Sequence, residues 1–356
     1  MDARSKSEEK AKCIVKYRQQ YYDLTNFMHK HPGGINTLKG LNQIDMTSRF
    51  MKAPPHSDAA MYLMREYKVD YDRENSANER RAEKLAENGV ELLGQQVAAQ
   101  KSEDSNNNQL DESMEHLVDW SKAMLPQISN ITKHYDEWVH KPVDRPLRLF
   151  GPWYLEMCTK TPWWVVPMFW IPTIIACGWD EVQANSHNMK EITTVISHLV
   201  CGVMFWTLLE YSLHRWVFHV QLTSNSGPWL CTFHFLIHGL HHKVPFDSMR
   251  LVFPPLPGVI IAVVIYTPLS IILQNYHPRL VLSGALLGYL CYDMIHYYLH
   301  YGNPSAGHHL YHMKRYHYQH HFAHQDLGYG ISSPIWDFVF KTRIHLRKLR
   351  YQIRWS

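Results

Sequence analysis

Histidines are concentrated in one part of this chain of 356 residues. The sequence has 25 histidines, and 16 of them lie between His214 and His324, roughly twice the number that an even distribution would place there. Imidazoles that are buried in a protein need hydrogen-bond partners or metal ions. The density of histidines therefore indicates a site that uses nitrogen ligands.

Ten of these histidines form four short motifs. The motifs are two pairs, His214/His219 and His296/His300, and two HxxHH triplets, His238/His241/His242 and His317/His320/His321. Residues four apart share one face of an α-helix, and an HxxHH triplet lies within an arc of about 100°. His214 and His219 diverge by about 140° on the same geometry, so we expect them to reach different metal ions, or the helix to end between them. Ten imidazoles divided between two ions give five each, with room for dioxygen or water.

The chemistry of the ligands narrows the choice of metal without deciding it. Imidazole suits iron, zinc, copper and nickel alike. A single cluster is more often structural, but four clusters with a repeated HxxHH motif favour a metal centre. The motifs contain no Asp or Glu that could bridge two ions. We therefore predict that mutual repulsion holds the ions farther apart than the ~3.5–4 Å of bridged sites.

A second pair of histidines could hold a haem. His31 begins the turn His31-Pro32-Gly33-Gly34, and His56 follows 25 residues later. Paired glycines allow a tight turn and a close approach to a large flat ligand. Two imidazoles that hold one iron from both sides leave no open site for dioxygen, so such a haem carries electrons.

Four apolar stretches could position the histidine motifs, because a membrane helix needs about 20 mostly apolar residues. They span residues 163–179, 192–213, 251–273 and 280–299. Prolines interrupt the first, which is also short, and suggest a kink in the third. Lys and Arg are more frequent before the first stretch, between the second and third, and after the fourth. The positive-inside rule then places both termini and the histidine-rich segments in the cytosol.

The rest of the chain predicts three parts. Residues 13–72 read as a small α+β domain, residues 73–117 as a polar, flexible linker, and residues 118–356 as a membrane-embedded domain. A net charge of +4 is too small to argue for binding to nucleic acid. The six cysteines form no CxxC pair, which favours free thiols in a reducing compartment, and the polar N-terminus predicts no cleaved signal peptide.

Both sites resemble known families. The HPGG turn, preceded by Tyr22-Asp23-Leu24-Thr25 and followed by His56-Ser57-Asp58, resembles cytochrome b5, although only a dozen residues precede Cys13 where the family has a further helix and strand. The four histidine motifs resemble the fatty acid hydroxylase superfamily of membrane di-iron enzymes. Tyr135-Asp136-Glu137-Trp138 and the segment 328–337 are similar to its fatty acid 2-hydroxylase branch.

This resemblance implies a fold, cofactors and a reaction. It implies a multi-pass α-helical membrane domain, with about four transmembrane helices and a cytosolic histidine-rich cap, preceded by a cytochrome b5-like domain. His31 and His56 would be axial ligands of haem b. The ten histidines would bind two non-haem metal ions, with iron expected for activity and zinc as a possible occupant. Asp293, one helical turn before His296, would orient an imidazole. His234, His308, His309, His312 and His324 would lie outside the ligand set.

The implied activity is hydroxylation by dioxygen at carbon 2 of a long-chain fatty acid or of the acyl chain of ceramide, in the endoplasmic reticulum membrane. Electrons would come from an NAD(P)H-dependent cytochrome reductase through the haem. Tyr329, Asp326 and Arg215 are candidates to hold the lipid head group. The alternatives are a desaturase or sterol-type oxidase with similar histidine motifs, or a non-enzymatic membrane protein that binds haem or zinc.

Overall fold

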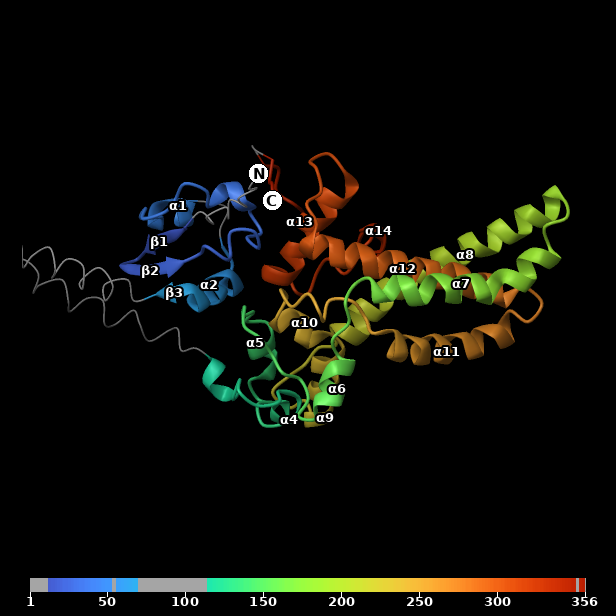
Figure 1. The fold of residues 1–356 in the computed structure, drawn as a ribbon, viewed down its shortest axis with the longest axis horizontal. Coiled ribbons are helices and arrows are strands. Elements are labelled where there is room, and N and C mark those ends of the chain that lie inside the picture. The colour runs from blue at the N-terminus through green and yellow to red at the C-terminus, as the bar shows by residue number, and fades with distance from the viewer. Residues whose placement is uncertain (1–11, 53–55, 70–113, 350–351, 356) are drawn as a thin grey trace, which may run out of the picture.

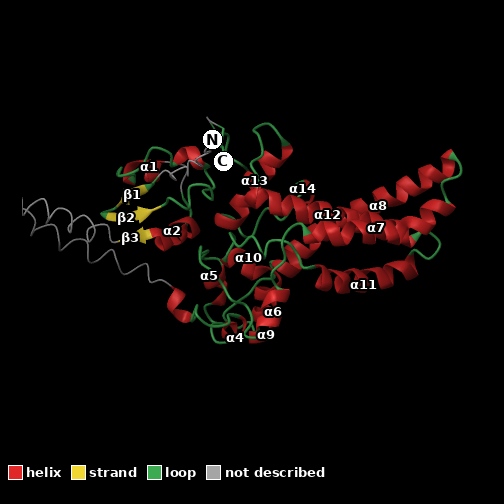
Figure 2. Cartoon of the chain, viewed as in Figure 1, coloured by secondary structure: helices red, strands yellow, loops and turns green. Residues whose placement is uncertain are grey.

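The computed structural model describes residues 12–52, 56–69, 114–349 and 352–355. Within these residues, strands occur only in the N-terminal part, and the rest is helix and loop (Figure 2). The last four residues of the predicted linker form the 3-10 helix η4 (Met114–Leu117), and most of that linker lies outside the described residues.

The N-terminal domain is a small antiparallel sheet with short helices. Strands β1 (Ile14–Tyr17), β2 (Gln20–Asp23) and β3 (Lys68–Val69) pair in that order. The turn between β1 and β2 has positive φ at both central residues, as tight hairpins prefer. His31 lies in a turn before η1 (Ile35–Thr37), and His56 immediately precedes helix α2 (Asp58–Met64), after helix α1 (Thr47–Lys52). The 3-10 helix η2 (Arg65–Tyr67) joins α2 to β3.

Within the described parts of the chain, four helices are long and apolar enough to cross a membrane, as the sequence predicted. They are α7 (Val165–Ala184), α8 (Met189–Leu213), α11 (Pro255–Ile272) and α12 (Pro278–Tyr301). Helix α7 continues five residues beyond the predicted stretch. Helix α11 begins four residues later than predicted, at Pro255, because a proline is tolerated at the first position of a helix.

Helix α12 is the centre of this bundle and packs against α7 and α8 (Figure 1). Helices α8 and α12 cross closely because glycines face each other. A Cβ added to Gly202 would collide with the carbonyl oxygen of Val281, and one added to Gly284 would collide with that of Leu199. Small residues at such crossings are typical of membrane helices.

Shorter helices form a cap between the bundle and the N-terminal domain (Figure 1). These helices and the residues beside them carry most of the histidine motifs, and His296 and His300 lie at the adjoining end of α12. The cap has a buried core that includes Trp138, Tyr135 and Phe235. Its helices are α4 (Leu125–Ile128), α5 (Tyr135–Val139), α6 (Trp153–Cys158), η5 (His214–Phe218), α9 (Pro228–His234), η6 (Phe235–Gly239), α10 (Leu240–Lys243), α13 (His309–Phe322) and α14 (Ile335–Val339).

Candidate metal centre

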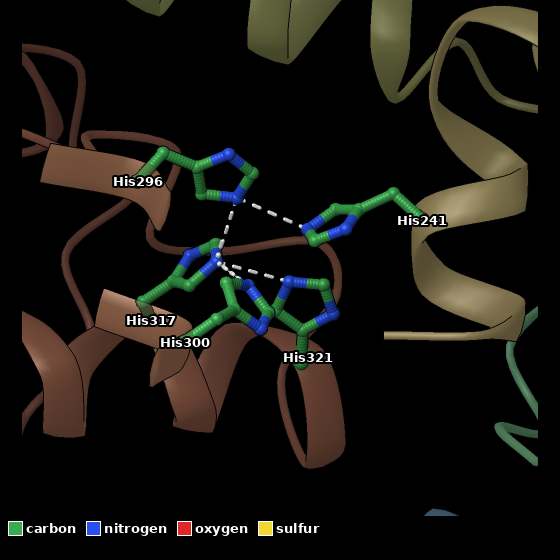
Figure 3. Close-up of side chains that lie close together, drawn as sticks. All are labelled: His241, His296, His300, His317 and His321. Atoms are coloured by element: carbon green, nitrogen blue, oxygen red, sulfur yellow. Dashed lines mark hydrogen bonds between the residues drawn. The ribbon is translucent and has the colours of Figure 1, made fainter. Parts of the chain in front are cut away.

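Five imidazoles from three helices converge at the cap end of α12, and we call this group site A (Figure 3). His241 comes from α10, His296 and His300 from α12, and His317 and His321 from α13. The Nε2 atom of His296 is 3.1 Å from those of His241 and His317. The Nε2 atoms of His300 and His321 are 2.9 Å and 3.0 Å from that of His317.

A second group, site B, lies beside the first. His214, His219, His238 and His320 bring their ring nitrogens within 4.8 Å of one another. His242 completes the group, because its Nε2 is 3.0 Å from that of His238. The Nε2 of His238 also lies 3.3 Å from that of His214 and 3.0 Å from that of His219.

Hydrogen bonding alone cannot explain this convergence. A ring nitrogen carries either one hydrogen or one lone pair, yet the Nε2 atoms of His317 and His238 each have three imidazole nitrogens as neighbours. Metal–nitrogen bonds of about 2.0–2.1 Å place the ligand nitrogens of one ion roughly 2.8–3.4 Å apart. The buried Nε2 of His320 has no hydrogen-bond partner. The donor sets therefore fit two metal ions, and neither contains a carboxylate within the described residues.

His214 and His219 belong to the same site, so the expectation that they reach different ions is wrong. The alternative expectation agrees with the structure, because the helix ends at Phe218, between the two histidines. The chain from His214 to Phe218 is a π-helical turn, in which the backbone N–H of His219 donates to the carbonyl of His214 (3.0 Å). A π-helix has about 4.4 residues per turn, so residues five apart diverge by about 50° rather than about 140°. Such turns are frequent at functional sites.

Each HxxHH triplet serves both sites. The first and last histidines, His238/His242 and His317/His321, turn to one site, while the middle ones, His241 and His320, belong to the other. The i and i+4 positions are about 40° apart on a helix, and i+3 points about 60° to the other side. The geometry of the two motifs therefore suits two adjacent ions.

Backbone carbonyls orient two ligands of site B. The Nδ1 of His214 donates to the carbonyl of Tyr329 (2.6 Å), and that of His320 donates to the carbonyl of Leu327 (2.8 Å). A hydrogen bond at Nδ1 fixes the tautomer and leaves Nε2 free to bind metal. The loop around Gly328 thus controls the geometry of site B.

Two buried carboxylates that sequence reasoning missed hold this loop. Glu210 accepts hydrogen bonds from the backbone of Ile331 and Ser332, and Asp337 accepts from the backbone of Tyr329 and Gly330. The sequence contained a signal for Glu210, which is an acid within an apolar helix one turn before His214. Asp337 ends the family-like segment 328–337, but no local pattern reveals its partners.

Asp293 does not contact an imidazole in the way that was expected. Its carboxylate accepts hydrogen bonds from the backbone N–H of Phe253 (3.3 and 3.2 Å), at the end of the loop that leads into α11. Its role as an orienting group for His296 therefore gains no support from the hydrogen bonds of the described residues. Of the histidines expected outside the ligand set, His234 is buried against the hydroxyl of Tyr135 (2.7 Å). The others are exposed or half-buried, namely His308, His309, His312 and His324.

Burial keeps the ligands neutral. Removal from water lowers the pKa of seven imidazoles outside the membrane helices well below its usual value, and neighbouring histidines lower this pKa further. The seven are His219, His238, His241, His242, His317, His320 and His321. A neutral imidazole keeps the lone pair that a metal ion needs.

His31 and His56 face one another across a space that fits an iron. Their ring centres are 6.4 Å apart, which two metal–nitrogen bonds of about 2 Å and the two ring radii account for. Thr37 donates its hydroxyl to the carbonyl of Gly34, so its oxygen accepts from Nδ1 of His31 (2.9 Å) and leaves Nε2 of His31 free. Burial and His56 lower the pKa of His31 to about 4.

An apolar cavity of about 470 Å³ runs between the membrane helices and reaches both sites. Its walls include Trp170, Trp206 and Ile261, and His238, His241 and His296 close its inner end. The lining does not include Tyr329, Asp326 or Arg215, the head-group candidates from the sequence.

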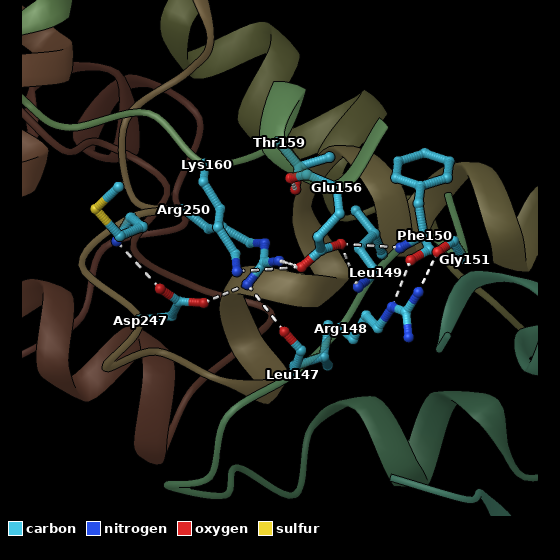
Figure 4. Close-up of polar contacts among 11 residues, drawn as sticks. Leu147, Arg148, Leu149, Phe150, Gly151, Glu156, Thr159, Lys160, Asp247 and Arg250 are labelled. Carbon is cyan, nitrogen blue, oxygen red and sulfur yellow. Dashed lines mark hydrogen bonds and ion pairs between the residues drawn. The ribbon is translucent and has the colours of Figure 1, made fainter. Parts of the chain in front are cut away.

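Arg250 is a charged residue in the wall of this cavity. Its guanidinium forms ion pairs with Glu156 and Asp247, and it also donates to the carbonyl of Leu147 (3.2 Å; Figure 4). Its Nε is buried without a hydrogen-bond partner in the described structure. A buried donor that lacks a partner costs about 1–3 kcal/mol, a cost that a polar ligand group would remove if it reached Nε.

Two family models match the chain, one for each of its two domains. Residues 199–342 match the family model for fatty acid hydroxylase, and residues 2–72 match that for the cytochrome b5-like haem/steroid binding domain. A solved structure of full-length scs7p, in which only the hydroxylase domain is visible, has a TM-score of 0.57 at 33% identity and covers 65% of this chain and 86% of its own.

Three curated relatives are similar along most of their length. The fatty acid 2-hydroxylase of Rattus norvegicus is 37% identical over 93% of this chain and 91% of its own. The ceramide very long chain fatty acid hydroxylase of Saccharomyces cerevisiae is 31% identical over 96% and 94%, and a dihydroceramide fatty acyl 2-hydroxylase of Arabidopsis thaliana is 40% identical over 64% and 93%. Because this similarity extends through both the haem-type domain and the histidine-rich domain, the chain belongs to the fatty acid 2-hydroxylase family of oxidoreductases.

Proposed function

We propose that this protein uses dioxygen to hydroxylate carbon 2 of long-chain acyl groups, supplied as free fatty acids or as the acyl chains of ceramide-type sphingolipids. The observation that carries the proposal is the apolar cavity that opens onto histidines of both sites. Largely apolar pockets with a few polar groups at one end are typical ligand sites. The names of the rat, yeast and Arabidopsis relatives support both kinds of substrate.

The reaction requires a redox metal, because an unactivated C–H bond resists acids, bases and nucleophiles. Iron ions at sites A and B would supply this chemistry, whereas zinc, which the same imidazoles can bind, has no redox states. The ten histidines hold the ions, and the apolar walls exclude water from the acyl chain. His31 and His56 would hold haem b, which passes on electrons from an NAD(P)H-dependent reductase.

The cavity also supports a proposal for which end of the substrate meets the metals. The acyl tail would lie among the membrane helices, and its carboxyl or amide group would lie at the cap, where Arg250 offers its unpaired Nε–H. This arrangement fixes the position of oxidation from the head group. The distribution of Lys and Arg supports a cap in the cytosol, and we place the protein in the endoplasmic reticulum membrane.

The test uses the iron-loaded protein in lipid, with a reductase, NAD(P)H, dioxygen and, in separate reactions, acyl substrates of increasing length or a sterol. Oxygen uptake and mass spectrometry of the product are measured. We expect the gain of one oxygen atom at carbon 2 for every chain length. Loss of two hydrogens would instead indicate a desaturase, oxidation of sterols alone a sterol oxidase, and no oxygen uptake a protein that only binds haem or metal.

A further inference from the structure

The haem-type domain lies beside the cap (Figure 1). Ion pairs between residues that are far apart in the sequence join the two parts. The ammonium group of Lys30 lies 2.5 Å from a carboxylate oxygen of Asp144, which also accepts from the hydroxyl of Tyr67 (2.6 Å). Arg145 donates from Nε and Nη2 to the two carboxylate oxygens of Glu66 (2.7 and 2.5 Å). Two neighbouring cap residues, Asp144 and Arg145, thus bind three residues of the haem-type domain.

The C-terminal tail holds the same domain from another side. Trp355 donates its indole N–H to the carbonyl of Pro32 in the HPGG turn (3.1 Å), and its ring packs on Tyr311 of α13. A Cβ on Gly34 would collide with the carbonyl oxygen of Arg354, and Gly34 has a φ of 80°. The second glycine of the HPGG turn is therefore required where the tail crosses the turn, as well as by the turn itself.

A continuous series of aromatic rings crosses this interface. The ring of Phe27 meets that of His31 at 5.8 Å and that of Phe246 in the cap at 6.0 Å. Phe246 lies 6.2 Å from Phe322, and Phe322 lies 6.1 Å from His321 of site A. Every step is a ring contact, so packed atoms connect a predicted haem ligand to a predicted metal ligand.

We propose that the haem domain works from this docked position and that Phe246 is the bridge by which an electron reaches site A. This inference rests on the proposed function. Electron tunnelling slows steeply with distance and with gaps between atoms. Because the rings of the series are in contact, the electron crosses no gap between them, and the docked domain does not have to diffuse to the cap. In each transfer the haem iron goes from ferrous to ferric while one iron ion of the metal pair takes up that electron. The pyridine-nucleotide-dependent reductase then returns the haem to the ferrous state.

Docking is tested in the full-length protein with a carbodiimide, which joins a contacting amine and carboxylate without a spacer. We expect mass spectrometry to find Lys30 joined to Asp144. Lys122 and Asp119, 3.0 Å apart within the cap, serve as the positive control. Arg145→Glu should abolish the first cross-link and keep the second, and adding Glu66→Arg should restore the first. If Lys30 and Asp144 do not cross-link in the unchanged protein while the control pair does, the docked position is refuted.

The route is tested by stopped-flow measurement of haem reoxidation after the haem has been reduced, in iron-loaded protein with substrate and dioxygen. Phe246→Leu keeps an apolar side chain but removes the ring, and should slow reoxidation several-fold with the Lys30–Asp144 cross-link intact. Phe246→Trp should restore the rate. Phe233→Leu, which removes a half-exposed ring elsewhere in the cap, is the matched control and should not change it.

The outcomes distinguish a failure of the proposed electron route through Phe246 from a failure of the proposed hydroxylase function. An unchanged rate in Phe246→Leu would overturn the route while hydroxylation continued. If the unchanged protein failed to reoxidise its haem or to form a hydroxylated product, the proposed function itself would fall.

Discussion

Asp337 offers a test of how the protein orients its metal ligands. The side chain is fully buried, and its Oδ1 accepts from the backbone of Tyr329 (2.9 Å) and the hydroxyl of Thr342 (2.8 Å). Its Oδ2 accepts from the backbone of Gly330 (2.8 Å). In Asp337→Asn one of these oxygens becomes an NH2 group, so a donor faces another donor in either orientation of the amide. A buried donor left without a partner costs about 1–3 kcal/mol.

The cost should appear at site B. The carbonyl of Tyr329, in the loop that Asp337 holds, accepts from Nδ1 of His214 (2.6 Å). Each 1.4 kcal/mol of destabilisation that is transmitted to the contact between Tyr329 and His214 lowers the affinity of site B for metal by about tenfold. Loss of an outer partner of a metal ligand typically weakens metal binding by about 10–100-fold, and the loop energy is large enough for such an effect.

The assay is metal retention against increasing chelator, with metal counted per chain and the haem absorbance recorded in parallel. We expect Asp337→Asn to lose about half its metal at ~10–100-fold lower chelator than the unchanged protein, with the same haem spectrum. Asp326→Asn, an exposed acid on the same loop, is the matched control. If Asp337→Asn holds its metal as firmly as the control does, the loop does not orient His214.

Three further predictions concern the metal ligands and the haem ligands. His320→Ala should abolish hydroxylation and lower the metal content while the haem spectrum stays unchanged, and His324→Ala, an exposed histidine nearby, should do neither. The double variant His31→Ala/His56→Ala should lose the low-spin haem spectrum. If this spectrum persists in the variant, His31 and His56 are not the haem ligands. The pKa of His31 in the haem-free fold is lowered to about 4, so its imidazole stays neutral as the pH falls through the usual value of 6.5. Haem rebinding, followed by its absorbance, should therefore persist toward pH 4. A rebinding midpoint at pH 6.5 would show that His31 is not buried.

Local patterns were sufficient for much of the fold. The four membrane helices follow from the length of their apolar stretches, because a span of bilayer fixes the length of a helix whatever its neighbours are. The cytochrome b5-like domain follows from the HPGG turn and the spacing of His31 and His56. The four histidine motifs marked all ten imidazoles that the structure gathers, because the i, i+3 and i+4 spacing is a property of a single helix.

The assignment of histidines to two sites was decided by tertiary structure. His214 and His219 share a site because the chain there forms a π-turn, which the sequence does not distinguish from an α-helix. The geometry of a single helix turns the middle histidine of each HxxHH motif away from the other two, but which site it joins depends on how α10, α12 and α13 bring their imidazoles together. The expectation for Asp293 rested on its spacing from His296, but the loop into α11 brings the backbone of Phe253 to its carboxylate instead.

The contacts between distant segments are likewise set only by the folded chain. Glu210 and Asp337 hold the loop that orients His214 and His320, although 127 residues of sequence separate the two acids. Phe27, Phe246 and Phe322 come from three regions, and each reads in the sequence as an ordinary core aromatic. The residue types and their spacing thus determined which ligands are available, because coordination chemistry depends on the side chain. Their grouping and orientation depend on backbone atoms and helix crossings that exist only after the segments pack.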